Sequence, residues 1–194
     1  MEPRTRGIIL LTGPMFAGKT RELISRLQTE SSHGNEVLAL NHALVGVSDS
    51  LVSRAGTRFA GTSVGSAFEA GGVVRERSPA VIGLDELHFF DSPIIDVLLN
   101  ASHSSLVLAA GLDLDFRGIP FPTTRELARL ADEVIHLSAR CAVCGRPASL
   151  SQRLTAGKPA SWFEGTIAFG VGTSYEPRCA TCHVVTDRPD HPPG

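Results

Sequence analysis

The chain alternates between short apolar runs and segments in which apolar residues recur at helical spacing. Five runs, each bounded by turn formers or charged residues, predict buried strands: GIILLTG (7–13), EVLAL (36–40), AVIGLDE (80–86), SLVLAAG (105–111) and VIHLSA (134–139). These runs do not alternate strictly between apolar and polar residues, and helical segments separate them. The pattern therefore predicts an α/β fold with a parallel sheet covered by helices on both faces.

Three segments between the strands are predicted to be helices. The first begins at Lys19 and ends at the turn formers SSHGN. The second, SPIIDVLLNA (92–101), has Ser92 in position to be the N-cap and Pro93 at the first helical position. The third is TTRELARLAD (123–132).

The rest of the chain has a different pattern. Residues 41–72 are rich in Gly, Ser and Ala, and we expect part of this region to be a mobile loop. After Arg140, short runs such as ASLSQRL and TIAFG lie between two CxxC pairs, which suggests a small β lobe tied by a metal. The predicted organisation is an α/β domain over residues 1–139, a small lobe over 140–185 and a proline-rich, disordered tail over 186–194.

Composition narrows the class of protein. The chain has 194 residues with 42% hydrophobic content, enough for a sizeable core. A net charge of −2 provides no broad attraction for nucleic acid or an anionic membrane. No apolar run approaches the ~20 residues that span a bilayer, and the N-terminal apolar stretch ends at Thr12–Gly13, too early for a signal peptide. We therefore expect a cytoplasmic protein.

The stretch GPMFAGKT matches every fixed position of the phosphate-binding pattern G-x-x-x-x-G-K-[ST]. In such a loop, backbone N–H groups surround phosphate oxygens at a helix N-terminus, the lysine reaches the β- and γ-phosphates, and the hydroxyl binds Mg²⁺. The alternative is a strand–turn–helix that binds no phosphate. The strand predicted before this stretch and the helix predicted after it favour the phosphate loop. The residues expected to bind ATP are Gly13, Pro14, Met15, Phe16, Ala17, Gly18, Lys19 and Thr20.

An acidic pair follows the third predicted strand. Asp85 stands where P-loop enzymes hold Mg²⁺, directly or through water, and Glu86 where a general base or a water-orienting group is expected. The alternative is a surface acidic pair at a strand end. Because the chain lacks an N-K-x-D motif, the sequence does not favour a GTPase.

All four cysteines fall in two CxxC pairs, Cys141/Cys144 and Cys179/Cys182. In a reducing compartment this arrangement favours metal binding over disulfides, and four thiolates suit a closed, structural Zn²⁺ site. The 34 residues between the pairs imply a long excursion, and His183 is an alternative ligand. A redox CxxC is disfavoured because neither pair opens a helix after an apolar strand.

Taken together, these motifs resemble the thymidine kinases that combine a P-loop core with a zinc-bearing "lasso" lobe. The resemblance is carried by GPMFAGKTRELI (13–24), DELHFF (85–90), GLDLDFRGIPF (111–121), CAVC (141–144) and YEPRCATCH (175–183), in the family's order. It implies transfer of the ATP γ-phosphate to the 5′-hydroxyl of thymidine, with Mg²⁺ and a structural Zn²⁺, in a homotetramer.

The resemblance also implies roles for single residues. Glu86 matches the catalytic base, and Lys19 and Thr20 match the phosphate and Mg²⁺ ligands. The side chains that it places around the nucleoside are Met15, Phe89, Phe116 and Tyr175. Burial preference alone would assign Phe89 to the core.

The chain departs from the family pattern after the second predicted strand. The family's D-x-R-Y stretch supplies an arginine near the transferring phosphate, but Gly46 falls at that position here, and Asp49, Arg54 and Arg58 are the nearby charged residues. FGVG (169–172) also differs from the family's usual V/I-G-G.

Several functions stay open at this point. The main reading is a divergent thymidine kinase, and the alternatives are a kinase with a changed nucleoside acceptor or a low-turnover ATP-binding regulator. A zinc-ribbon nucleic-acid binder with an ATPase core is disfavoured, because Lys and Arg do not cluster around the cysteines.

Overall fold

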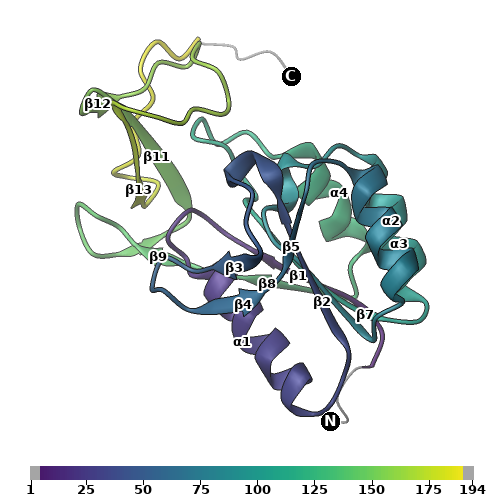
Figure 1. Cartoon of the computed structure of the whole chain (residues 1–194). Helices are drawn as coiled ribbons and strands as arrows, with labels where there is room; N and C mark the ends of the chain where they lie inside the picture. The colour runs from purple at the N-terminus through teal and green to yellow at the C-terminus, as the bar shows by residue number, and fades with distance from the viewer. Residues whose placement is uncertain (1–4, 190–194) are drawn as a thin grey trace.

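The computed structural model describes residues 5–189 and is built around a six-stranded parallel sheet (Figure 1). The strand order is β5-β2-β6-β7-β1-β8. The strands are β1 (Gly7–Thr12), β2 (Val37–His42), β5 (Thr62–Val64), β6 (Val81–Leu84), β7 (Leu106–Gly111) and β8 (Glu133–His136). Every neighbouring pair is parallel. The predicted α/β fold is confirmed, and all five predicted strands belong to this sheet.

Helices cover both faces of the sheet (Figure 1). On one face, helix α1 (Lys19–Ser32) packs beside the hairpin of β3 (Ser50–Val52) and β4 (Arg58–Ala60). The opposite face carries α2 (Ala67–Arg77), α3 (Pro93–Ser102) and α4 (Pro122–Leu130).

An apolar core lies on each face of the sheet, and alternate side chains along a strand enter one core or the other, as β1 shows. Ile8 and Leu10 lie in the core beneath α2–α4, whereas Ile9 and Leu11 lie in the core beneath α1. A strand buried on both faces reads as a continuous apolar run, which is why these runs predict strands well.

Residues 41–72, where the sequence predicts a partly mobile loop, contain several short regular elements. They form a short 3₁₀ helix η1 (Ala43–Val45), the β3–β4 hairpin, edge strand β5 and the start of α2. The Ser66 hydroxyl accepts from the Glu69 N–H at 3.2 Å, and the Glu69 carboxylate accepts from the Gly65 N–H at 2.6 Å, so side chains cap α2. Ser92 occupies the N-cap position of α3 and Pro93 the first helical position, as predicted, but the Ser92 side chain makes no capping hydrogen bond.

The small lobe contains two antiparallel sheets. One pairs β9 (Ala139–Arg140) with β10 (Pro147–Ala148), and the other has the order β12-β11-β13. Its strands are β11 (Leu150–Thr155), β12 (Lys158–Pro159) and β13 (Thr173–Arg178). TIAFG (166–170) forms no strand and instead leads to β13.

Thr186 begins the predicted disordered tail, yet backbone hydrogen bonds tie it to Ala160 and Trp162. Residues 190–194 of that tail lie outside the described range. Among residues 5–189, no helix is long and apolar enough to cross a bilayer.

Candidate active site

The GPMFAGKT stretch forms a tight loop between β1 and α1. Gly13 has φ +140°, and a Cβ there would lie 2.1 Å from the carbonyl oxygen of Leu137, so only glycine fits. Gly18 adopts a left-handed conformation directly before α1. The Lys19 ammonium donates to the carbonyls of Gly13 at 3.0 Å and Pro14 at 2.7 Å. The loop thus curls around a partly buried cation at a helix N-terminus, which suits phosphate binding.

Asp85 is buried directly beneath this loop. Burial raises the pKa of the Asp85 carboxyl, and a hydrogen bond from the Thr20 side chain opposes that effect. The Glu86 N–H also donates to Asp85 Oδ1 at 3.0 Å. A hydroxyl and a carboxylate beside a phosphate loop are oxygen donors of the kind Mg²⁺ prefers, so these residues fit the ion.

Glu86 lies at the floor of the cavity, in a left-handed conformation with φ 57°. Its side chain keeps 31% exposure. Desolvation by the surrounding protein raises the pKa of Glu86 to about 7, and Asp85 adds to the shift, while Lys19 and Arg54 oppose it. A carboxylate with this pKa can accept a proton near neutral pH.

His88 is buried next to Glu86. Burial lowers the pKa of His88 to about 3, so the imidazole is neutral at physiological pH. His88 Nδ1 accepts a hydrogen bond from the Leu112 N–H at 3.2 Å, which places the proton on Nε2. Nε2 lies 3.6 Å from Glu86 Oε2, so a neutral N–H faces the carboxylate.

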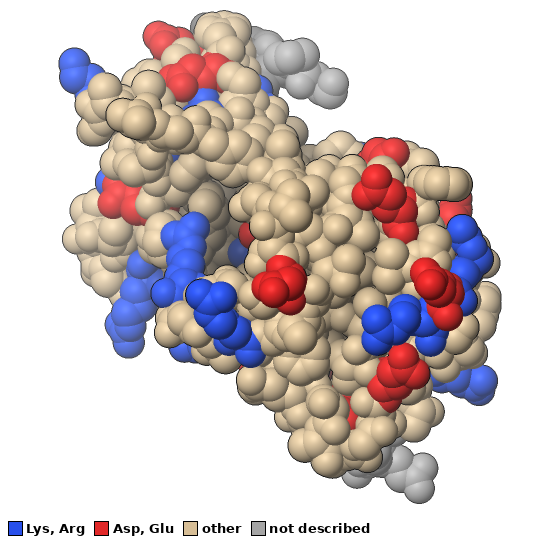
Figure 2. Space-filling view, in the orientation of Figure 1, with Lys and Arg blue, Asp and Glu red and all other residues tan. Residues whose placement is uncertain are grey.

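A cavity of about 1190 Å³ opens between the α/β core and the small lobe. Figure 2 shows this hollow, with Lys and Arg side chains along its edge. The predicted site residues that line it are Met15, Phe16, Ala17, Gly18, Lys19, Thr20, Glu86, Phe89, Phe116 and Tyr175. Gly13, Pro14 and Asp85 support Lys19 and Thr20 instead of lining the cavity. The structure therefore brings the phosphate loop, the acidic pair and the aromatic residues to one place.

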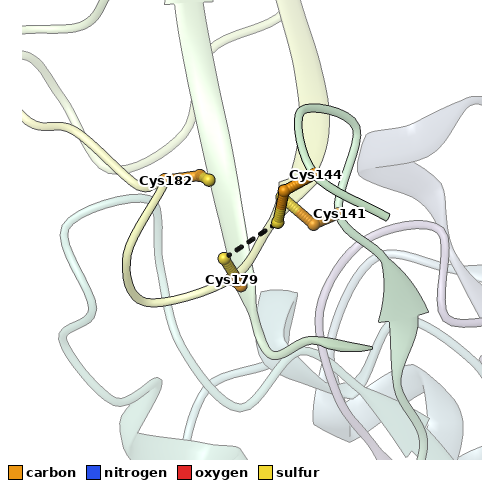
Figure 3. A group of neighbouring side chains, drawn as sticks. All are labelled: Cys141, Cys144, Cys179 and Cys182. Atoms are coloured by element: carbon orange, nitrogen blue, oxygen red, sulfur yellow. Dashed lines mark hydrogen bonds between the residues drawn. The ribbon is translucent and has the colours of Figure 1, made fainter. Parts of the chain in front are cut away.

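The four cysteines form a separate cluster in the lobe (Figure 3). Their sulfur atoms all lie within 4.8 Å of one another. A tetrahedral Zn²⁺ with Zn–S bonds of about 2.3 Å requires S–S separations of about 3.8 Å, and the Cys144–Cys179 distance is 3.6 Å. The cluster therefore fits zinc.

Arg146 and His183 lie near the cysteine cluster and make different contacts. Arg146 Nε lies 3.4 Å from Cys144 Sγ and lowers the pKa of that thiol, which favours the thiolate that zinc binds. His183 Nε2 instead contacts the backbone oxygen of Phe116 at 2.9 Å. The alternative that His183 replaces a cysteine ligand is therefore wrong.

Comparison with known proteins agrees with this arrangement. The family model described as thymidine kinase matches residues 6–183. The chain belongs to the thymidine kinase family. A thymidine kinase of Thermococcus kodakarensis is 37% identical over 196 aligned positions, covering 96% of this chain and all of the relative. A thymidine kinase of Mycoplasmoides gallisepticum is 38% identical, covering 92% of this chain and 81% of the relative.

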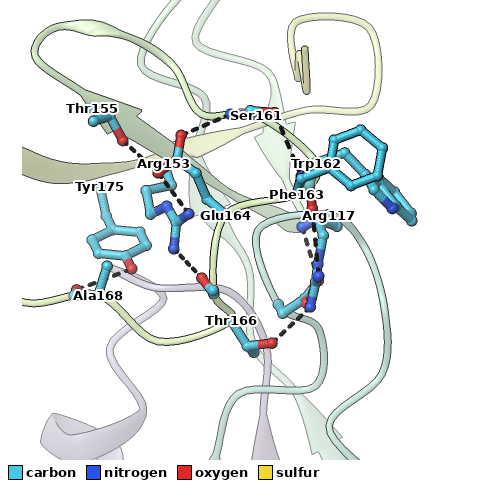
Figure 4. Close-up of polar contacts among 12 residues, drawn as sticks. Arg117, Arg153, Thr155, Ser161, Trp162, Phe163, Glu164, Thr166, Ala168 and Tyr175 are labelled. Carbon is cyan, nitrogen blue, oxygen red and sulfur yellow. Dashed lines mark hydrogen bonds and ion pairs between the residues drawn. The ribbon is translucent and has the colours of Figure 1, made fainter. Parts of the chain in front are cut away.

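In this thymidine kinase family member, an arginine that sequence reasoning did not single out supports the aromatic end of the cavity (Figure 4). Arg153 is fully buried, and its guanidinium lies 3.8 Å from the ring centre of Phe116. It donates to the carbonyl of Gly165 at 2.5 Å and to Glu164 Oε2 at 2.9 Å. Arg153 thus joins Phe116 to the lasso, the segment of the lobe that begins at Glu164. In the sequence, Arg153 stands among polar residues in the short run ASLSQRL, which gives no sign that its side chain is buried.

Arg117 makes a second connection between the same two segments. It pairs with Asp115 at 2.6 Å and donates to Thr166 Oγ1 at 2.7 Å. Further along, the Tyr175 hydroxyl donates to the carbonyl of Ala168 at 3.3 Å (Figure 4). Loop 111–121 and the lasso are therefore held together on one side of the cavity.

The region that departs from the family pattern is also resolved by the structure. Gly46 ends η1 with φ 113° and does not line the cavity. Asp49 and Arg58 are exposed and do not line it either. Arg54 does line it, and its guanidinium lies 3.8 Å from the ring centre of Phe16.

Proposed function

We propose that this thymidine kinase family member transfers the γ-phosphoryl group of ATP to the 5′-hydroxyl of thymidine, giving dTMP and ADP. One observation carries the proposal: the phosphate loop and Glu86 face the same cavity as Phe89, Phe116 and Tyr175. A phosphate site, a base and an aromatic compartment in one cavity suit a nucleoside acceptor. The names of both relatives support this choice of acceptor.

In the proposed mechanism, Glu86 accepts the proton of the 5′-hydroxyl as the new O–P bond forms. The bond between the γ-phosphorus and the bridging oxygen breaks, and ADP leaves. Lys19 and the N–H groups at the start of α1 bind the phosphates. Thr20 and Asp85 would hold Mg²⁺, which would offset phosphate charge when bound. Positioning and charge provide most of the catalysis in such reactions.

The proposed substrate compartment is formed by Met15, Phe89, Phe116 and Tyr175. Phe89 packs against the ring of Phe169 with centroids 6.0 Å apart, so core and lasso residues meet there. An apolar, aromatic wall suits a flat pyrimidine base. The four cysteines are proposed to bind a structural zinc that anchors the lasso.

We also propose that the two domains meet at residues 139 and 140, since the central sheet ends at His136 and β9, at Ala139–Arg140, is the first strand of the antiparallel sheets. A homotetramer and a cytoplasmic location remain predictions. Light scattering coupled to gel filtration tests the former, and microscopy of the tagged protein tests the latter.

The test of the function is ADP release from purified protein with Mg-ATP, alone or with thymidine, deoxyuridine or deoxycytidine. Strong stimulation by thymidine, together with dTMP in the product, is the expected result. Stimulation by another nucleoside alone would identify a kinase with a changed acceptor. A protein that binds ATP and zinc but responds to no nucleoside would be the low-turnover regulator.

A further inference from the structure

Arg54 extends from a rigid turn between β3 and β4. The Ser53 N–H donates to the carbonyl of Thr57 at 2.9 Å, and the Gly56 N–H donates to the carbonyl of Ser53 at 2.9 Å. The Thr57 N–H adds a bond to Ser53 Oγ at 3.1 Å. Leu51 anchors the hairpin in the core beneath α1. The backbone that carries Arg54 is therefore fixed relative to the sheet.

The Arg54 side chain lies on the phosphate loop. Its guanidinium carbon is 3.8 Å from the ring centre of Phe16, a residue of that loop with φ 67°. Such stacking of a guanidinium on an aromatic face restricts where the cation can lie. Arg54 is thereby kept at the phosphate end of the cavity, away from the aromatic compartment.

Burial and the nearby charge of Glu86 both affect the pKa of Arg54. Partial desolvation lowers the pKa of its guanidinium, and Glu86 opposes that effect, so the cation faces the acidic floor of the cavity. Among residues 5–189, no carboxylate lies within ion-pair distance of Arg54, and no protein group accepts a hydrogen bond from it. Its N–H groups are therefore available to an anion.

We propose that Arg54 is a catalytic residue that contacts the γ-phosphoryl group of ATP and neutralises its charge during transfer. This inference rests on the proposed kinase function. In phosphoryl transfer, negative charge spreads over the equatorial oxygens, and an arginine supplied by the same chain can stabilise it. Lys19 provides a point charge at the loop, whereas the planar guanidinium can bind two oxygens at once.

Other cations near the cavity are less well placed. Arg21 and Arg140 line it, but Arg140 donates to the carbonyl of Gly145 at 3.4 Å within the lobe. Arg21 lies on the first turn of α1, with its guanidinium 3.5 Å from the position that a Cβ on Gly18 would take. Only Arg54, among the arginines that line the described cavity, stacks on a phosphate-loop side chain.

Arg54→Ala, Arg54→Lys and Arg58→Ala form a matched set for the test. Arg58 lies on the same hairpin and is exposed, as Arg54 is, but it does not line the cavity, so it controls for hairpin stability and net charge. We expect kcat of Arg54→Ala to fall by about 10³-fold or more, the range of arginines in phosphoryl transfer, with little change in KM for thymidine or in zinc content. Arg54→Lys should recover only part of the rate, because it lacks the planar fork. Arg58→Ala should resemble the wild type.

A second measurement separates this proposal from the kinase function itself. Contact with the γ-phosphoryl group predicts that Arg54→Ala loses affinity for Mg-ATP at least several-fold while its affinity for Mg-ADP is unchanged. Calorimetry on the full chain without nucleoside tests this even if no nucleoside is phosphorylated. An unchanged ATP-to-ADP affinity ratio, or a kcat within twofold of wild type in an active enzyme, would overturn the role of Arg54.

Discussion

Glu86 and His88 lie side by side after β6, and burial moves their pKa values in opposite directions. The pKa of Glu86 is raised to about 7 and that of His88 is lowered to about 3, because desolvation disfavours the charged form of each group. The carboxyl therefore titrates near neutral pH beside an imidazole that stays uncharged. This contrast supports Glu86, and not His88, as the group that exchanges a proton.

The pH dependence of activity follows from the proposed role of Glu86. A base must be ionised, so kcat/KM for thymidine should be low below the raised pKa and rise as the pH increases through about 7. Steady-state rates between pH 5.5 and 9 test this. A profile that is flat between pH 6 and 8 would contradict the role.

Glu86→Gln gives a direct check on the same residue. It preserves size but cannot accept a proton, so kcat should fall by about 10²–10⁴-fold while ATP and thymidine still bind. Glu126→Gln, on the exposed side of α4, is the matched control. Unchanged turnover in Glu86→Gln would remove Glu86 from its assigned role.

Among the elements of the structure, β11 connects the lobe to the cavity through Arg153. Its guanidinium packs on Phe116, and its partner Glu164 is about one-third exposed. Replacing Arg153 by Met keeps most of the side-chain volume but releases both Phe116 and the segment from Glu164 onward.

We therefore expect Arg153→Met to raise KM for thymidine about tenfold, or 1.4 kcal/mol, and to leave KM for ATP near the wild-type value. Lys158→Met, on exposed strand β12 of the same sheet, is the control. Steady-state kinetics with each substrate varied in turn measure both constants. An equal rise in KM for both substrates would indicate a general loss of structure instead.

The elements also show which parts of the fold could be predicted from the sequence. Strands buried on both faces and the phosphate loop were predictable, because their signals are local. Strand β5 has only three residues and no strong apolar pattern, so it was missed. The cap of α2 was detectable, since Ser66 and Glu69 have the spacing of a capping box.

Contacts distant in the sequence were beyond prediction. Arg54 and Arg58 lie on one hairpin, and no local rule indicates which of them reaches Phe16. Arg153 is similar, since its partners Phe116 and Glu164 are brought to it by tertiary packing. Knowledge of the spatial arrangement was needed to assign a role to either arginine.

At the scale of the whole molecule, the apolar cluster of the lobe is formed largely by cysteines, whereas the α/β core has a separate apolar interior. Removing zinc with a chelator should therefore weaken thymidine-stimulated turnover strongly, because the lasso loses its anchor. Mg-ATP binding by the core should persist. Metal analysis with calorimetry for each substrate tests this, and full thymidine affinity in zinc-free protein would contradict it.

One hydrogen bond joins the two parts at the phosphate loop itself. The Met15 N–H donates to Ser151 Oγ on β11 at 2.9 Å. A shift of the lobe around a nucleoside would thus act on the phosphate loop through this hydrogen bond. By thermodynamic linkage, whatever factor the nucleoside applies to ATP affinity, ATP must apply to nucleoside affinity in return. The two substrates of this enzyme family member are therefore expected to bind cooperatively, with Ser151 as part of the coupling.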